Sequence, residues 1–293
     1  MSDGYINVDL HSHPNPDRYV IDDLVLRTVD KGIDVLAIVD YRRENRFEAY
    51  SWQARNFNGR GMCFHTYDNG IIADYEDKQI VLLRGQEIAT NEGHVLVVGA
   101  ENYLKSQDVG IGYVTSLSKG GLNIADHFAV TAWDGIGEEV LRQHMNFWDA
   151  IEYNAQCVDA FPSLFGVFDF MRQKNANDYA MEAAKRLDIP LIASSDAHMT
   201  GINGLWDFEQ LGHSYTKVSK MLFVTPTDFV EYFRECLYEK KHEPVCETVP
   251  VKYWWNWFVG NALDKEFISW ALQKHILKKK VKLQDGKKWK FDD

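Results

Sequence analysis

The sequence lacks several features that would place it in a specialised class of protein. No apolar run approaches the length needed to cross a bilayer, and the first residues show neither the basic stretch nor the apolar core of a secretory signal peptide. There are only 4 cysteines in 293 residues and no Cys-x-x-Cys pair, which argues against a disulfide framework or a structural zinc site. These absences predict a cytoplasmic protein without a membrane partner, whose cysteines are reduced thiols: Cys63, Cys157, Cys236 and Cys246.

The sequence also lacks an excess of positive charge. Its formal net charge is −11, which argues against broad binding to duplex nucleic acid through the phosphates. An acidic protein of this kind is suited to holding divalent cations among its carboxylates. Hydrophobic residues make up 45% of the chain and charged residues 26%, which is ordinary for a globular protein. A length of 293 residues is sufficient for one large α/β domain with a small appendage.

Strand-like and helix-like segments alternate along most of the chain. This alternation predicts a mostly parallel sheet with helical crossovers, and seven or eight such units favour a closed or distorted barrel over an open sheet. The expected strands are 5–10, 33–40, 80–83, 94–99, 122–125, 150–154, 189–194 and 221–224, and the expected helices are 20–31, 43–57, 108–118, 136–145, 177–187 and 226–240.

Metal-ligating side chains follow several of these strands. The most prominent are the two imidazoles of Asp9-Leu10-His11-Ser12-His13, because residues two apart on a strand point to the same side. In (β/α) barrels the C-terminal strand ends carry the active site. Potential ligands that lie at or just beyond such ends predict a polynuclear metal site, and they are His11, His13, Asp40, Glu87, His127, Asp196 and His198.

The same residues carry a resemblance to the PHP (polymerase and histidinol phosphatase) family. The resemblance covers roughly residues 5–240 and implies a distorted (β/α)7 barrel that performs metal-dependent hydrolysis of phosphate esters. We place this barrel in residues 1–245. The motifs are Asp-Leu-His-x-His at 9–13, Ile-Val-Asp-Tyr at 38–41, Gly-Gln-Glu-Ile at 85–88, Ala-Asp-His at 125–127 and Ser-Asp-Ala-His at 195–198.

The resemblance also implies two or three divalent metals, usually manganese, iron or zinc. Carried over by motif, the first metal takes His11, His13, Glu87 and Asp196, the second takes Glu87, His94 and His127, and the third takes Asp17 and His198. The family usually has a histidine where this chain has Tyr41. Since a phenol with a pKa of about 10 is a poor ligand at neutral pH, we expect two tightly held metals and a weak or absent third.

Two cations bridged by Glu87 could share a hydroxide, because coordination lowers the pKa of water towards neutrality. They would also neutralise phosphoryl oxygens in the transition state. The expected substrate is a small phosphomonoester or a nucleotide. Asp17 or His198 is the expected proton donor to the leaving group, and Asp196 is predicted to act at the same reacting centre.

Three arginines follow the second expected strand directly, at the mouth of the predicted site. Arg42, Arg43 and Arg46 are candidates for binding the substrate phosphate, because a guanidinium suits bidentate contacts with phosphate oxygens. The alternative is a solvated first helical turn, in which these arginines pair with Glu44 and Glu48.

Residues 246–293 differ from the rest in composition, with crowded aromatic residues followed by lysine-rich runs. We expect a small helical, aromatic-rich extension that packs on the barrel, with a lid over the substrate as the alternative. The lysine runs could contact nucleic acid, although a solvated terminus is favoured. Other functions open to the same site are a nuclease, a C–N hydrolase and a catalytically silent metal-binding module.

Overall fold

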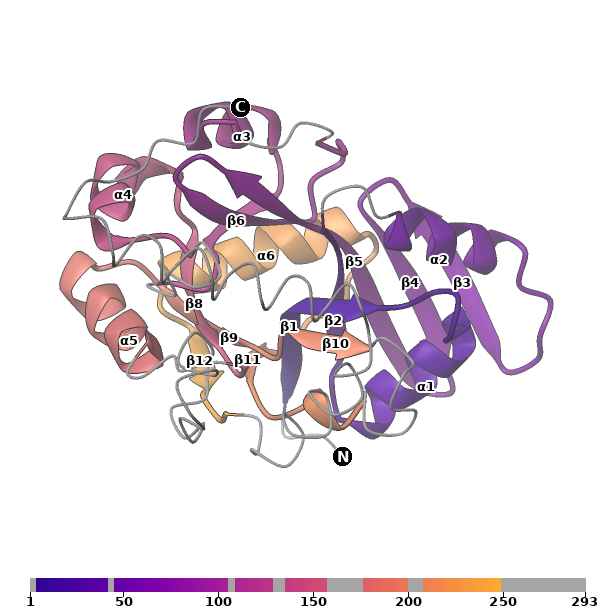
Figure 1. Ribbon diagram of the computed structural model, residues 1–293. Coiled ribbons are helices and arrows are strands. Elements are labelled where there is room, and N and C mark those ends of the chain that lie inside the picture. Colours follow the sequence, from indigo (N-terminus) through magenta and orange to yellow (C-terminus); the bar gives the residue numbers. More distant parts are fainter. Residues whose placement is uncertain are drawn as a thin grey trace, which may run out of the picture.

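The computed structural model describes residues 4–41, 45–104, 109–128, 135–156, 176–199 and 208–248. Within these residues the strands form one mixed sheet that curls into a nearly closed barrel, with helices around it (Figure 1). The strands are β1 (Tyr5–Pro14), β2 (Val35–Tyr41), β3 (Met62–Tyr67), β4 (Gly70–Tyr75), β5 (Lys78–Thr90), β6 (Gly93–Val98), β7 (Leu122–Ala125), β8 (Ala150–Asn154), β9 (Leu191–Ser194), β10 (Ala197–Met199), β11 (Tyr215–Ser219) and β12 (His242–Val245). The helices are α1 (Ile21–Asp30), α2 (Arg46–Arg55), α3 (Ile111–Leu117), α4 (Glu138–Gln143), α5 (Ala176–Leu187) and α6 (Pro226–Tyr238).

The main path of the sheet is β12-β11-β1-β2-β5-β6-β7-β8-β9, and the β3–β4 hairpin extends it beside β5. The two ends of the curl meet through side-chain contacts. The backbone N–H of Ala193 in β9 donates to Thr216 Oγ1 in β11 at 2.9 Å, and the N–H of Ser195 donates to Asp9 Oδ1 in β1 at 3.1 Å. The expected distorted barrel is therefore confirmed.

Side chains alternate between the inside and the outside of the barrel, as the period of a strand requires. In β2, Val35, Ala37 and Val39 belong to the interior cluster, whereas Leu36 and Ile38 pack outward against α1 and α2. A third cluster packs α3, α4 and α5 against the outer face of β6, β7 and β8. Helices therefore cover both flanks, and the interior is filled from one end by apolar side chains.

Helix α6 closes the apolar end of the barrel. Its residues Phe229, Val230 and Phe233 are fully buried in the interior cluster. Gly99 allows the close approach, since its φ is +74° and a Cβ there would lie 2.3 Å from Val230 Cγ2. A capping box fixes the start of α6, because Thr225 and Asp228 exchange side-chain and backbone hydrogen bonds. With this end closed, polar groups can gather only at the other end.

The sheet departs from the expected mostly parallel arrangement in several places, since β3, β4, β11 and β12 form antiparallel pairs. The departure that matters for the site is at β6. This strand runs antiparallel to both β5 and β7, because a tight turn at residues 91–92 joins it directly to β5. An antiparallel strand starts where its neighbours end, so His94 near the start of β6 lies at the same rim as the C-terminal ends of the other strands.

The expected strand at 221–224 was wrong. The strand is β11, which ends at Ser219, and Leu222 and Val224 are 79% and 78% exposed. The N–H of Val224 donates to Asp228 Oδ2 at 3.2 Å, so this backbone serves the start of α6 instead of a sheet. The β3–β4 hairpin, β10 and β12 were not foreseen. The predicted C-terminal extension lies outside the described residues from position 249 onward.

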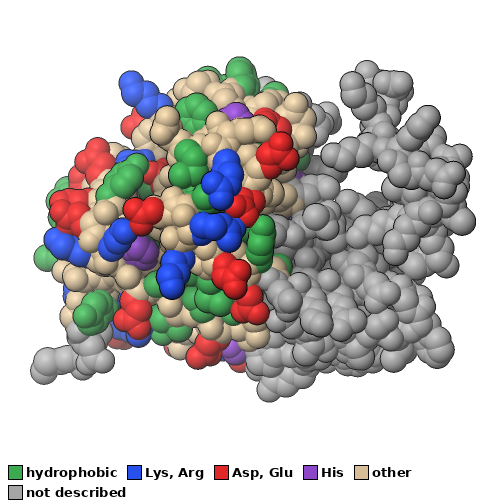
Figure 2. Space-filling view, turned by 90° about the vertical axis from the view of Figure 1, so that its left-hand side faces the viewer, with side chains coloured by type: hydrophobic (Ala, Val, Ile, Leu, Met, Phe, Trp, Pro, Cys, Tyr) green, Lys and Arg blue, Asp and Glu red, His purple; other side chains and the backbone are tan. Residues whose placement is uncertain are grey.

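Two further expectations concern the surface and the cysteines. No helix among the described residues is long and apolar enough to cross a membrane. The cysteines within the described ranges, Cys63, Cys236 and Cys246, are free thiols, while Cys157 falls outside those ranges. On the described part of the face that Figure 2 shows, acidic and basic side chains are interspersed, as on an ordinary solvated surface.

Candidate metal centre

Histidine, aspartate and glutamate side chains gather at the end of the barrel opposite α6. They form four overlapping groups, and within each group the potential ligand atoms all lie within 4.8 Å of one another. Every member except the partly exposed His198 is buried. The overlap makes this a candidate multinuclear metal site. The groups are His11, Asp126, His127 and Glu152; Glu87, His94, Asp126 and His127; His11, His13 and Glu87; and His13, Asp196 and His198.

A β-bulge in β1 aims the first two histidines into the barrel. Asp9 pairs with Leu36 of β2, but the next pair is Ser12 with Ile38, so three steps along β1 match two along β2. Before the bulge even-numbered residues such as Leu10 face the interior. After it the odd-numbered His11 and His13 do so, because one extra residue reverses which face a side chain takes.

The other ligands follow from strand alternation and two backbone turns. Glu87 continues the inward series of β5 that contains Val81 and Leu83. His127 and Asp196 lie just beyond β7 and β9 with positive φ angles of 43° and 49°. Such left-handed conformations are uncommon outside glycine and often mark functional positions. Here they turn both side chains towards the centre of the cluster.

The hydrogen bonds of His11 and His13 leave their Nε2 lone pairs facing each other. His11 Nδ1 lies 2.8 Å from Glu152 Oε1, and His13 Nδ1 lies 3.1 Å from the carbonyl oxygen of Val39. Both oxygens accept, so each neutral ring carries its hydrogen on Nδ1. The two Nε2 atoms are 3.1 Å apart. Two lone pairs this close would repel each other, so either a proton or a metal cation must lie between them. Burial lowers the pKa of His11, but neighbouring carboxylates, chiefly Asp196, raise it well above its ordinary value, so this position attracts positive charge. An accepting oxygen at Nδ1 is also how ligating histidines are oriented.

Two carboxylates complete the surroundings of these nitrogens. Glu87 Oε2 lies 3.9 Å from His11 Nε2 and 3.6 Å from His13 Nε2. Asp196 Oδ1 lies 3.5 Å from each of the same nitrogens. Neighbouring ligands of a cation bound at about 2.1 Å are roughly 3.0–3.5 Å apart. The four side chains expected for the first metal are therefore arranged so that they could all bind a single cation.

The second expected set shares Glu87 with the first. Glu87 Oε1, the oxygen that does not face His11 and His13, lies 2.6 Å from His94 Nδ1 and 3.9 Å from His127 Nδ1. One carboxylate thus faces two sets of imidazoles, one with each oxygen. This is the geometry that a bridging ligand needs.

Burial and neighbouring charges strongly shift the pKa values of the side chains in the cluster. Burial disfavours ionisation of Asp196, but nearby His11 and His198 hold its pKa well below the ordinary value. Burial also disfavours the imidazolium of His127, yet Asp126 and Asp196 raise its pKa to about 10. The pKa of His13, in contrast, is lowered to about 3 by burial. The surplus of carboxylates therefore attracts positive charge, which metal ions would supply.

Several buried oxygens support the same conclusion. Among the described residues, Asp9 Oδ2, Asp196 Oδ1 and both carboxylate oxygens of Asp126 have no hydrogen-bond partner. Unpaired buried carboxylate oxygens are costly and usually coordinate metals or pair with cations. The donor set of imidazoles and carboxylates suits manganese, iron or zinc, so the residues present fit the expected metals.

The third expected set is less complete. His198 Nδ1 lies 3.4 Å from Asp196 Oδ1, and its side chain is 44% exposed. Asp17 is exposed and belongs to none of the four groups. The ring of Tyr41 lies 5.8 Å from that of His94, on the same rim.

Asp40, named from the sequence as a potential ligand, also belongs to none of the four groups. Its Oδ1 accepts the backbone N–H of Arg46 at 2.6 Å, so Asp40 fixes the first residue of α2. Arg46 in turn donates to the carbonyl of Val39 at 3.2 Å. Its charge is near enough to contribute to the lowered pKa of His13. Arg46 is therefore close to the cluster, whereas Arg42 and Arg43 lie outside the described residues.

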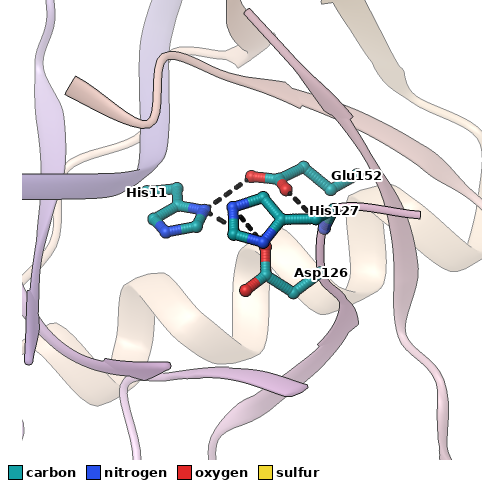
Figure 3. Close-up of side chains that lie close together, drawn as sticks. All are labelled: His11, Asp126, His127 and Glu152. Atoms are coloured by element: carbon teal, nitrogen blue, oxygen red, sulfur yellow. Dashed lines mark hydrogen bonds and ion pairs between the residues drawn. The ribbon is translucent and has the colours of Figure 1, made fainter. Parts of the chain in front are cut away.

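Two carboxylates of the cluster were missed in the sequence. Figure 3 shows Glu152 from β8 and Asp126 from the end of β7 beside His11 and His127. Glu152 accepts four hydrogen bonds, from His11 Nδ1, the Ser194 hydroxyl, the N–H of His127 and Asn154 Nδ2. The available signal was a carboxylate at an inward position of an otherwise apolar strand, Ala150-Ile151-Glu152-Tyr153-Asn154.

These observations define a mixed α/β barrel with a buried, multinuclear candidate metal site at its open end. Residues 174–236 match a family model described as PHP-associated. This match and the buried cluster, which is typical of the PHP metal site, confirm the resemblance to the PHP family. No curated protein matches the chain.

Proposed function

We propose that the chain is a metal-dependent hydrolase that cleaves phosphate esters, with a small phosphomonoester or a nucleotide as substrate. The observation that carries the proposal is the position of Glu87, which faces the imidazoles of His11 and His13 with one oxygen and those of His94 and His127 with the other. Such a carboxylate would hold two cations close enough to act on one phosphoryl group. Members of the PHP family are typically phosphoesterases of this kind.

Divalent metals, when bound, supply a nucleophile from water at neutral pH and neutralise phosphoryl oxygens. The chain's own residues would do the rest. Glu152 fixes the ring of His11 through Nδ1, and Asn154 Nδ2 donates to Asp196 Oδ2 at 3.1 Å, so both ligands are held in place. In this proposal the partly exposed His198 gives a proton to the leaving group and Arg46 contacts the phosphate; the effect of the Arg46 charge on His13 supports the second role. The proposed location is the cytoplasm.

The test is a screen of phosphorylated metabolites, nucleotides and oligonucleotides with the manganese-loaded chain. We expect turnover of a small phosphoester, and we expect Glu87→Gln to lower both metal content and turnover by orders of magnitude, because the substitution removes a charge shared by two cations. The matched control is Glu138→Gln. Glu138 accepts hydrogen bonds from Arg142, Tyr179 and Arg186 and belongs to none of the four groups, so this variant should keep wild-type turnover.

The outcomes separate the rival functions. Cleavage of oligonucleotides alone would favour a nuclease, and metal binding without hydrolysis of any phosphoester would favour a C–N hydrolase or a silent metal-binding module. Wild-type turnover by Glu87→Gln would show that Glu87 does not bridge two catalytic metals.

A further inference from the structure

The carboxylate of Asp126 has no role in the ligand sets expected from the sequence. It is fully buried, with 0% of its surface exposed, and neither oxygen has a hydrogen-bond partner among the described residues. Its Oδ1 lies 3.5 Å from His127 Nε2 and 3.4 Å from His11 Nδ1. A buried carboxylate that no hydrogen bond stabilises needs positive charge beside it, which a protonated imidazole or a metal cation would supply.

We propose that Asp126 is a fourth protein ligand of the second metal, in addition to Glu87, His94 and His127. The potential ligand atoms of these four side chains lie within 4.8 Å of one another. The inference rests on the proposed metal-dependent function of the same site. It adds a carboxylate that the ligand set carried over from the family does not include, since that set takes only His127 from this strand end.

The other group that contains Asp126 is a poorer metal site. It would need His11, Glu152 and His127 as fellow ligands, and the only His11 atom on that side is Nδ1. This nitrogen lies 2.8 Å from Glu152 Oε1 and donates its hydrogen there. It has no lone pair to offer unless that bond is lost. His94 Nδ1 also lies within hydrogen-bond distance of a carboxylate, Glu87 Oε1 at 2.6 Å, but its Nε2 is not assigned to another metal, whereas Nε2 of His11 faces the first site. The second site is therefore the place where Asp126 can coordinate.

The added carboxylate has consequences for the charge of the centre. The third site has Tyr41 where an imidazole is expected, whereas the second gains a negative ligand. Two carboxylates and two imidazoles would neutralise a divalent cation and bind it firmly. Four protein ligands fill the usual coordination of zinc. A metal that accepts six ligands, such as manganese, would keep open positions for water and substrate.

Manganese titration of the full-length chain tests the role of Asp126. His13→Ala removes a ligand of the first site only, and His94→Ala removes a ligand of the second site only, so each variant leaves one site to be measured. Asp126→Asn is then added to each. In the His13→Ala background we expect manganese affinity to fall by about 100-fold or more, since losing even an outer-shell partner costs 10–100-fold. In the His94→Ala background it should change less than about threefold.

The matched control is Asp149→Asn. Asp149 is also a buried aspartate, but it pairs with Arg234 at the opposite end of the barrel. It should leave manganese affinity unchanged in both backgrounds. Equal losses from Asp126→Asn in the two backgrounds would overturn the proposal and show that Asp126 acts through His11. No loss in either would also overturn it and show that Asp126 is a ligand of neither metal.

A second measurement does not depend on the variants folding. Anomalous diffraction from manganese-loaded wild-type crystals should place an Asp126 oxygen at about 2.2 Å from the second ion, the usual length of a metal–carboxylate bond. A separation beyond 3 Å would refute coordination. Neither measurement uses turnover, so the result is independent of whether the loaded chain hydrolyses a phosphoester.

Discussion

Replacing Glu152 with glutamine should weaken metal binding at the first site without removing any ligand. All four hydrogen bonds to this side chain come from donors, two at each oxygen. Oε1 accepts from His11 Nδ1 and the Ser194 hydroxyl, and Oε2 accepts from the N–H of His127 and from Asn154 Nδ2. Whichever way a glutamine amide is turned, its NH2 group meets two donors.

The size of the effect follows from this count. Burial alone would raise the pKa of Glu152, but His11 and His127 lower it to about 2, so the side chain is ionised at neutral pH. Hydrogen bonds to a charged group are worth roughly 1.5–3 kcal/mol each. Losing two of them should lower the free energy of unfolding by about 3–6 kcal/mol. An outer-shell partner of a ligating histidine contributes 10–100-fold in metal affinity, or about 1.4–2.8 kcal/mol.

The assay is calorimetric titration of manganese into the metal-free wild type and Glu152→Gln, with urea unfolding of the same samples. Glu138→Gln is the control, because it also removes the charge of a glutamate with several hydrogen-bond partners but lies outside the cluster. An affinity within about threefold of wild type in a folded Glu152→Gln would contradict the argument that Glu152 orients His11.

Three further predictions concern other parts of the molecule. Phe233→Ala should lower the free energy of unfolding by about 3–5 kcal/mol, measured with urea, because Phe233 is fully buried in the barrel interior; a loss below 1 kcal/mol would mean that α6 does not seal the barrel. Hydrogen bonds from Tyr179 and Arg142 lower the pKa of Glu138 to about 2. The stability that Glu138 adds is therefore present above the ordinary carboxylate pKa of about 4.5 and is lost as pH falls towards 2. The melting temperature of Glu138→Gln should be below that of wild type at pH 7, and the gap should narrow below about pH 5; a gap that stays constant down to pH 3 would refute this. Deleting residues 278–293 should leave the kinetics on a small phosphoester near wild type, since that basic charge matters mainly for long polyanions, and a large loss of kcat in a folded variant would show the opposite.

Much of the centre could be predicted because the ligands lie at strand ends that a barrel brings together. His11, His13, Glu87, His127 and Asp196 each follow or end a recognisable apolar run, and parallel strands end at one rim. His94 was assigned through the family motif alone. Its strand begins at the rim instead of ending there, which the sequence does not reveal, since the direction of β6 depends on a two-residue turn.

Other parts could not be predicted from local pattern. Asp126 and Glu152 are inward-facing because of the register of β7 and β8 with their neighbours, and register is a tertiary property. Asp40 has the same sequence context as a ligand, but its alternation places it with the outward Leu36 and Ile38. The apolar run at 221–224 looked like a strand, yet the backbone N–H of Val224 donates to Asp228 of the capping box at the start of α6.

The bulge in β1 makes the centre depend on how that strand pairs as well as on which residues it contains. If β1 paired regularly with β2 beyond Asp9, with no residue removed, the alternation that places Leu10 in the interior would continue and turn His11 and His13 towards the helices outside. The sequence would still contain both imidazoles, and an alignment would still show the full motif, but these two ligands would be absent from the centre. Insertions in the helical connections, in contrast, would leave the pairing of β1 and the direction of both rings unchanged.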